Sequence, residues 1–209
     1  MECSVTRTSL PEALLLQLSA YLEILLRWNA RTNLTSIRTP EEIVTRHFGE
    51  SLFAAQKLFP DDSEAGKSAL ADVGSGAGFP GLPIKLWAQL NNPQLHVTLI
   101  ESQQKKATFL REVIRALDLT DIEVQPTRAE QVSKTFDIIT LRAVEHFDQI
   151  LPTAANLVRT SGRLALLIGQ EQIAITQTLL PTFQWDKPHV IPNSTSRVLL
   201  IGTTPQESS

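Results

Sequence analysis

Blocks of apolar and polar residues alternate along the chain after residue 68. Most short apolar runs of strand length are followed by a longer segment in which apolar residues recur at helical spacing. The predicted strands span residues 69–73, 95–101, 122–125, 136–141, 163–168, 185–191 and 197–201, and the predicted helices span residues 82–90, 104–117, 147–160 and 172–180. Such alternation predicts an α/β fold with a mostly parallel sheet and helices on both faces.

The last two predicted strands depart from this pattern. No helix separates residues 185–191 from residues 197–201. A short connection joins antiparallel neighbours, whereas parallel strands need a long crossover. We therefore predict a seven-stranded sheet that is parallel except for an antiparallel hairpin at one edge.

Two helices are expected before the first strand. Leucines recur at helical spacing across residues 11–28, and Thr39-Pro40 marks the start of the second helix, with Thr39 as its N-cap. A polar connection, residues 60–68, then leads to the first strand. We divide the chain into an N-terminal helical extension (1–68), an α/β core (69–203) and a tail (204–209).

Composition and charge narrow the class of protein. With 209 residues, 42% of them hydrophobic, the chain suits one α/β domain. The net charge of −3 gives no overall attraction to nucleic acid, so any RNA-binding surface must be local. The single cysteine, Cys3, excludes an intramolecular disulfide and a cysteine-based metal site, and we predict no other metal site. Polar residues interrupt the first leucine-rich helix, which argues against a signal peptide or a membrane span, and we expect a cytoplasmic protein.

The segment after the first strand reads Asp72-Val-Gly-Ser-Gly-Ala-Gly-Phe-Pro-Gly81. Glycine has no Cβ and tolerates positive φ, so such a turn lets a nucleotide-like ligand approach bare backbone at the start of a helix. The acid and three close glycines fit the S-adenosylmethionine pocket of class I methyltransferases. The last part, Gly76-Ala-Gly78-Phe-Pro-Gly81, also satisfies the G-x-G-x-x-G pattern of nicotinamide-binding domains. The antiparallel ending of the sheet favours a methyltransferase.

Acidic residues at two strand ends are candidates for cofactor contacts, because ligands of open α/β sheets bind there. Glu101 ends the second strand, where its carboxylate would accept hydrogen bonds from both ribose hydroxyls or remain a solvated charge. Asp72 would meet the methionine moiety or cap the glycine turn. Phe79, inside the turn, has little core to fill and is a candidate to pack against the cofactor.

The next two strands lead to further candidates. In class I methyltransferases the loop after the third strand, here Thr127-Arg-Ala-Glu130, meets the adenine through a backbone N–H. Arg142 follows the fourth strand, where target-facing residues emerge, although it could instead pair with Glu130 or Asp137.

Several catalytic groups that other acceptors require are missing. Methylation of cytosine C5 needs a cysteine nucleophile, and Cys3 lies in the N-terminal segment. Methylation of the adenine amino group commonly uses an Asn/Asp-Pro-Pro-aromatic loop, where this chain reads Ile139-Thr-Leu-Arg-Ala-Val144. The remaining acceptor is an atom that is already nucleophilic, such as guanine N7. Such a reaction needs positioning groups, for which Arg142 and Arg197 are candidates, and no general base.

The motifs of this chain together resemble those of the RsmG (GidB) family. They are Trp28-Asn-x-x-x-Asn-Leu-Thr35, His47-x-x-x-Ser-Leu52, the glycine turn with Gly-Phe-Pro-Gly81, Glu101-Ser-x-x-Lys-Lys106, Arg128-Ala-Glu130, Arg142-Ala143 and Gly169-Gln170, and the match runs from about residue 25 to 200. The resemblance implies a class I, Rossmann-like enzyme that uses S-adenosyl-L-methionine to methylate guanine N7 in the decoding-region loop of 16S rRNA. By motif match, Gly74, Phe79, Ala129, Glu130 and Arg142 fall on cofactor-binding positions; we add Gly76 and Glu101.

The chain departs from the family pattern at three positions. Leu141 stands where serine is usual, and Ile168 stands where lysine is common. Glu50 is a conservative change at the position of the acid that usually precedes Ser-Leu. The lost lysine is the only support for an alternative, a ribosome-assembly factor that binds cofactor and rRNA but transfers slowly; turnover raised by Ile168→Lys would favour it. A nicotinamide-dependent oxidoreductase is the other alternative. Calorimetry that compares the binding of NADH with the binding of S-adenosylhomocysteine would distinguish it from a methyltransferase.

Local clusters of basic residues are expected to supply the RNA-binding charge. We predict that Arg128, Arg197 and Lys105 contact RNA. Because an arginine bound to N7 would block attack, the arginines are expected to hold phosphates or guanine O6. His47 is expected to pack as a helix residue rather than act as a base. The expected partner is 16S rRNA, the small ribosomal subunit or an assembly intermediate. We expect the protein to be a monomer that does not bind a membrane.

Overall fold

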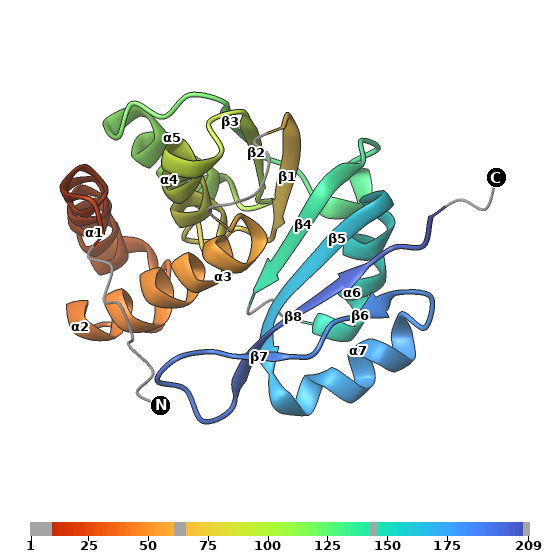
Figure 1. Ribbon diagram of the computed structural model, residues 1–209. Coiled ribbons are helices and arrows are strands. Elements are labelled where there is room, and N and C mark those ends of the chain that lie inside the picture. Colours follow the sequence, from red (N-terminus) through yellow and green to blue (C-terminus); the bar gives the residue numbers. More distant parts are fainter. Residues whose placement is uncertain (1–9, 61–65, 143–145, 207–209) are drawn as a thin grey trace.

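The computed structural model describes residues 10–60, 66–142 and 146–206, and these form an α/β fold around one sheet (Figure 1). Its strands are β1 (Ser68–Val73), β2 (Leu95–Ile100), β3 (Ile122–Gln125), β4 (Phe136–Arg142), β5 (Val158–Gly169), β6 (Gln184–Trp185), β7 (His189–Val190) and β8 (Arg197–Thr203). The order is β3-β2-β1-β4-β5-β8-β6, with β7 also paired to β8. The first five strands pair in parallel and β8 lies antiparallel to β5, so the predicted fold class is confirmed.

The edge of the sheet differs in one respect from the prediction. The expected strand at residues 185–191 is divided into β6 and β7, which both pair with β8, so the described residues form eight strands rather than seven. Pro188 lies between the two short strands. Because proline has no N–H to donate to a strand ladder, pairing stops there.

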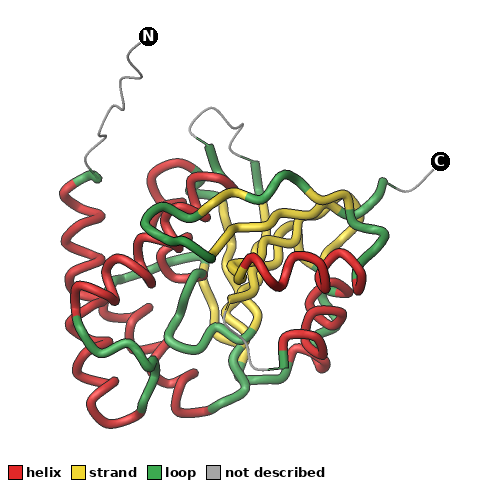
Figure 2. The backbone as a smooth tube through the Cα atoms, turned by 90° about the horizontal axis from the view of Figure 1, so that it is seen from below, coloured by secondary structure: helices red, strands yellow, loops and turns green. Residues whose placement is uncertain are grey.

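Helices cover both faces of the sheet, as Figure 2 shows from below. One face carries α4 (Gly81–Asn91) and α5 (Gln104–Ala116), and the other carries α6 (Phe147–Asn156) and α7 (Ile173–Leu179). Consecutive strand residues point to opposite faces, so Leu70 belongs to the first core cluster and Ala71 to the second. The sequence pattern predicts a helix that ends at residue 160, but α6 ends at Asn156 because β5 already begins at Val158.

The N-terminal segment is helical and packs beside α4 and α5. It consists of α1 (Glu12–Thr32), α2 (Pro40–Glu42), a π-helix, η1 (Ile43–Gly49), and α3 (Glu50–Leu58). Thr39 is the N-cap of α2, as predicted, and its hydroxyl accepts a hydrogen bond from the Glu42 N–H. The same core cluster contains residues of α1, α3 and the sheet, so the extension is packed on the core. Whether the chain divides at residue 68 stays a prediction.

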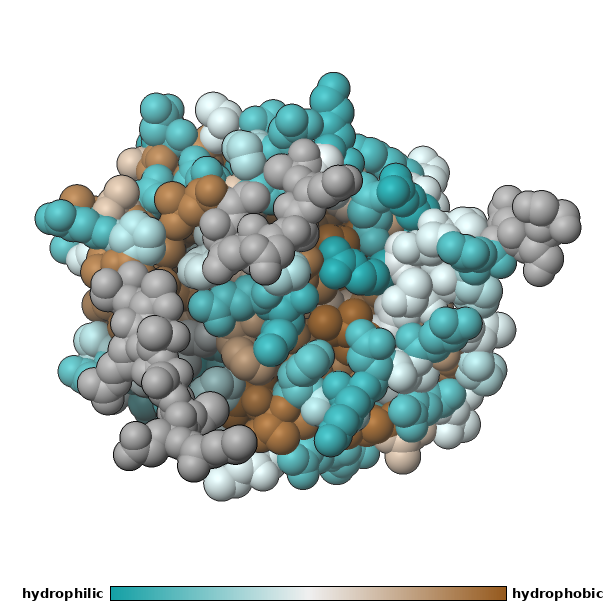
Figure 3. Space-filling view, viewed as in Figure 1, coloured by the Kyte–Doolittle hydropathy of each residue, from teal (hydrophilic) through white to brown (hydrophobic). Residues whose placement is uncertain are grey.

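Two short 3-10 helices, η2 (Ala129–Gln131) and η3 (Gln170–Gln172), follow the ends of β3 and β5. The space-filling view shows hydrophilic residues around the rim and hydrophobic residues over the strands between α3 and β7 (Figure 3). No helix within the described residues is long and apolar enough to cross a membrane.

Candidate functional site

The glycine turn between β1 and α4 has the backbone conformation that its sequence predicts. Gly74, Gly76 and Gly78 have φ values of 68°, 57° and 88°, in the left-handed region that favours glycine. A Cβ on Gly78 would lie 2.4 Å from Leu82 Cδ1 and 2.5 Å from the Tyr21 hydroxyl oxygen. The turn is therefore both strained for other residues and tightly packed.

Asp72 acts as the cap of this turn. One carboxylate oxygen accepts a hydrogen bond from the Gly81 N–H at 3.2 Å, and the other accepts one from the Thr140 hydroxyl at 2.8 Å. Burial raises the pKa of Asp72 to about 6, although these hydrogen bonds act in the opposite direction. Asp72 does not line the cavities described below, so of its two expected roles the structure favours the cap.

Glu101 joins the end of β2 to the same turn. Its carboxylate accepts one hydrogen bond from the Gly76 N–H at 2.9 Å and another from the Gln103 N–H at 2.7 Å. The residue is buried, with 5% exposed. Each carboxylate oxygen has more than one lone pair, so each can accept a further hydrogen bond from a ligand.

Two adjoining cavities meet at Gly74, Glu101 and Ser102. The larger, of about 560 Å³, is also lined by Gly76, Phe79, Lys106, Arg142 and Arg197, among others. The second, of about 410 Å³, includes Arg128, Ala129 and Glu130. The fold thus brings together every predicted cofactor-binding residue. Lys105 is exposed on α5 outside both cavities, and its neighbour Lys106 lines the larger one instead.

A single carboxylate, that of Glu50, holds the two arginines at the strand ends. Its Oε2 accepts a hydrogen bond from Arg142 at 3.1 Å and another from Arg197. Arg142 also donates to the Arg46 carbonyl oxygen at 2.9 Å, and its buried Nε has no partner among the described residues. Burial lowers the pKa of Arg142 to about 10, and the Glu50 charge acts against that shift.

Sequence reasoning did not foresee the role of Glu50. The suggested partners of Arg142 were Glu130 and Asp137, but Glu130 lines the second cavity and Asp137 is paired with Arg159. The signal that was available was the acid at position 50, which lies at the start of a helix otherwise rich in apolar residues.

Phe79 packs in an aromatic cluster formed with residues of the N-terminal helices. Its ring stacks on Tyr21, with centroids 5.4 Å apart, and on His47, with centroids 4.7 Å apart. The Tyr21 hydroxyl donates a hydrogen bond to the Ala77 carbonyl oxygen. The expectation that Phe79 has little core to fill is therefore wrong, because α1 and η1 supply that core. Phe79 still lines the larger cavity.

Sequence comparison identifies the family of this chain. A model of the GidB family, described as rRNA small subunit methyltransferase G, matches residues 15–189. This chain belongs to that family.

Several bacterial relatives are named Ribosomal RNA small subunit methyltransferase G. The relative from Xanthomonas axonopodis pv. citri is 38% identical over 179 residues, which cover 83% of this chain and 79% of that protein. The relative from Chloroflexus aggregans is 37% identical over 200 residues, 90% of this chain and 80% of that protein. The relative from Roseiflexus castenholzii is 44% identical over 153 residues, which cover 70% of this chain and 62% of that protein.

Solved methyltransferases share the fold of this GidB-family chain. Magnesium protoporphyrin IX methyltransferase (ChlM) from Synechocystis PCC 6803, with bound SAM, superposes with a TM-score of 0.66 at 14% identity, covering 95% of this chain and 100% of that chain. A ribosomal protein L11 methylase from Lactobacillus delbrueckii subsp. bulgaricus gives a TM-score of 0.59 at 18% identity, covering 74% and 76%. The Rossmann-like methyltransferase fold is therefore confirmed.

His47 in this GidB-family chain is a packed histidine, as expected. Its Nε2 lies 2.7 Å from the Thr35 hydroxyl oxygen, and its buried Nδ1 has no partner among the described residues. Burial, with the positive charges of Arg142, Arg46 and Arg197, lowers the pKa of His47 to about 3. The imidazole is therefore neutral at physiological pH, and it does not add to the positive charge of the site.

The depressed pKa of His47 makes stability depend on pH. Above pH 6.5 the imidazole is neutral in both folded and unfolded chains, whereas below pH 6.5 only the unfolded chain gains the proton. Relative to His47→Gln, the wild type should therefore lose about 2 kcal/mol of unfolding free energy between pH 7 and pH 5. Urea denaturation of both proteins at the two pH values measures this difference. Parallel pH profiles would mean that folding does not keep His47 neutral.

Proposed function

We propose that this GidB-family protein is an S-adenosyl-L-methionine-dependent methyltransferase that methylates N7 of a guanine in the decoding-region loop of 16S rRNA. The observation that supports it best is the pair of adjoining cavities. They connect the glycine turn and Glu101 with the Ala129–Glu130 loop on one side and with Arg142 and Arg197 on the other. That arrangement suits a nucleoside cofactor with an RNA acceptor beside it.

The described residues fit the parts of this cofactor. Glu101 is positioned to accept hydrogen bonds from the ribose hydroxyls, while Ala129 and Glu130 would border the adenine. Gly74, Gly76 and Phe79 would surround the methionine part, with the buried guanidinium of Arg142 available to a carboxylate. When bound, S-adenosylmethionine supplies a methyl group activated by a sulfonium charge.

The reaction requires little acid–base catalysis by the protein. With the cofactor bound, the N7 lone pair of guanine would form the new bond to the methyl carbon, and the electron pair of the broken carbon–sulfur bond would stay on sulfur. No proton has to leave, so no general base is needed, in line with a neutral His47 of low basicity. Arg142 and Arg197 would act by positioning the acceptor, and the methyl group and N7 must be held in line.

Three basic residues, Arg128, Arg197 and Lys105, are the ones that we propose for contacts with RNA. Arg197 lines the larger cavity and Arg128 the second, while Lys105 projects from the nearby surface of α5. We propose that these residues hold RNA phosphates, and that the protein acts as a cytoplasmic monomer. The substrate would be 16S rRNA, alone, in the small subunit or in an assembly intermediate.

Mapping modified nucleotides of small-subunit rRNA tests this proposal directly. Mass spectrometry of rRNA from cells with and without the protein should show one 7-methylguanine in the decoding-region loop that disappears on deletion. Adding the purified protein and S-adenosylmethionine to the unmodified subunits should restore it. Identical rRNA from both cells would contradict the proposal and leave only the fold and the family.

A further inference from the structure

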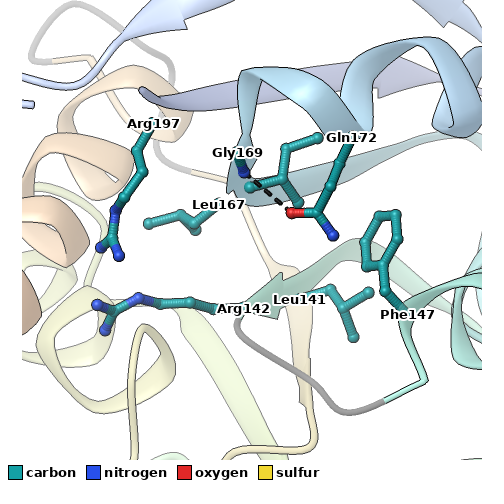
Figure 4. Close-up of a pocket in the computed structure, with 8 residues that line it drawn as sticks. Leu141, Arg142, Phe147, Leu167, Gly169, Gln172 and Arg197 are labelled. Carbon is teal, nitrogen blue, oxygen red and sulfur yellow. Dashed lines mark hydrogen bonds between the residues drawn. The ribbon is translucent and has the colours of Figure 1, made fainter. Parts of the chain in front are cut away.

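A third, smaller cavity of about 120 Å³ lies next to the proposed cofactor site. It opens between the ends of β4 and β5 and adjoins the larger cavity at Arg142 and Arg197, which line both spaces (Figure 4). Leu141, Leu167 and Ile168 supply apolar walls, and the ring of Phe147 also lines the space. Such a slot suits a flat ring that is buried mostly by apolar contact and by stacking.

Gln172 reaches this slot from η3 and is, besides Arg142 and Arg197, a polar side chain in its lining. Its Oε1 accepts a hydrogen bond from the Gly169 N–H at 3.0 Å, the dashed line in Figure 4. Because a backbone N–H can only donate, the amide oxygen must face Gly169, and the orientation of the amide is fixed. The NH₂ group then points toward Phe147, and none of the described residues accepts a hydrogen bond from it.

We propose that this slot binds the target base and that Gln172 selects guanine by donating a hydrogen bond to O6. This inference rests on the proposed function. With its oxygen engaged, the amide can only donate toward the slot. Guanine presents the O6 acceptor next to N7, whereas adenine, which also has an N7, presents an amino group that can only donate there. The fixed amide therefore favours guanine over adenine at the same site.

Gln172→Glu reverses this preference while keeping the contact with Gly169. One carboxylate oxygen still accepts the Gly169 N–H, but the other now presents an acceptor to the slot. Methylation of guanine should fall on the order of 10- to 100-fold, and the guanine-to-adenine ratio should fall at least about tenfold. The measurement is methyl transfer to small subunits that carry guanine or adenine at the target position, from cells that lack the protein.

Two controls separate this role from a general loss of structure. Gln177→Glu makes the same chemical change on the exposed side of α7, and should leave both rates unchanged. Gln172 lines neither larger cavity, so Gln172→Glu should bind S-adenosylhomocysteine as tightly as the wild type does.

The outcomes distinguish the slot from the proposed function. A wild type that transfers no methyl to guanine N7 overturns both. A wild type that methylates guanine, together with an unchanged guanine-to-adenine ratio in Gln172→Glu, overturns the slot alone. An equal loss in Gln177→Glu also overturns it, because the effect would then come from added charge.

Discussion

Replacing Glu50 with glutamine should lower the free energy of unfolding by about 3–5 kcal/mol, because it leaves buried charge without its partner. The side chains of Glu50 and Arg142 are each only 5% exposed, and Arg197 binds the same carboxylate oxygen. Glutamine keeps the size of the side chain but removes the negative charge between two guanidinium groups. Urea denaturation at neutral pH measures the loss.

The same substitution should also reduce methyl transfer, since the carboxylate that bridges Arg142 and Arg197 among the described residues would then be gone. Glu41→Gln is the matched control, because Glu41 is an exposed acid in the preceding helical turns. It should change the unfolding free energy by no more than about 0.5 kcal/mol. A loss below about 1 kcal/mol for Glu50→Gln would show that solvent or another group neutralises the arginines.

This ion-pair cluster shows where sequence reasoning stops. Glu50 is 92 positions from Arg142 and 147 from Arg197. Apolar periodicity places each residue on an element, but it carries no information about which polar side chains meet across elements. The aromatic cluster at Phe79 was missed for the same reason, because its partners Tyr21 and His47 come from the N-terminal helices.

Local chemistry, in contrast, could be predicted closely. The central parallel strands are largely buried, so β1 and β2 stand out as short and mainly apolar runs, and the predicted bounds of β3 match the structure. The glycine turn was recognisable because glycine adopts positive φ far more readily than other residues, so closely spaced glycines indicate such a turn. The failure at residues 185–191 was also local, since Pro188 stood in the sequence as a sign against a continuous strand.

The residues that we propose for cofactor binding could be predicted to lie near one another, because they lie at strand ends or in the loops that follow them. Glu101 and Ala129 follow β2 and β3, and Arg142 is the last residue of β4; the carboxyl ends of these parallel strands lie at one edge of the sheet. Of the two neighbouring lysines on α5, Lys106 and not Lys105 lines the larger cavity, because a helix turns by about 100° per residue. The RNA contact of Lys105 stays a prediction.

Adding a single methyl group at Gly78 should damage the turn more than the size of the change suggests. In Gly78→Ala the new Cβ would lie 2.4 Å from Leu82 Cδ1, 2.5 Å from the Tyr21 hydroxyl oxygen and 3.1 Å from Leu110 Cδ2, on a backbone with φ of 88°. Overpacking and backbone strain each cost about 1–3 kcal/mol, so we expect a loss of about 2–5 kcal/mol in unfolding free energy. Denaturation measures it, and calorimetry with S-adenosylhomocysteine should show weaker binding.

Gly66→Ala provides the matched control for this prediction. The same substitution there meets nothing within 4 Å, and Gly66 is exposed before β1. It should leave cofactor binding unchanged and alter stability by less than about 1 kcal/mol. If Gly78→Ala were as stable as Gly66→Ala and bound S-adenosylhomocysteine normally, the turn could move away from Tyr21 and Leu82 without cost. The packing of α1 against the turn would then contribute nothing to the shape of the proposed cofactor site, contrary to what the hydrogen bond from Tyr21 to Ala77 implies.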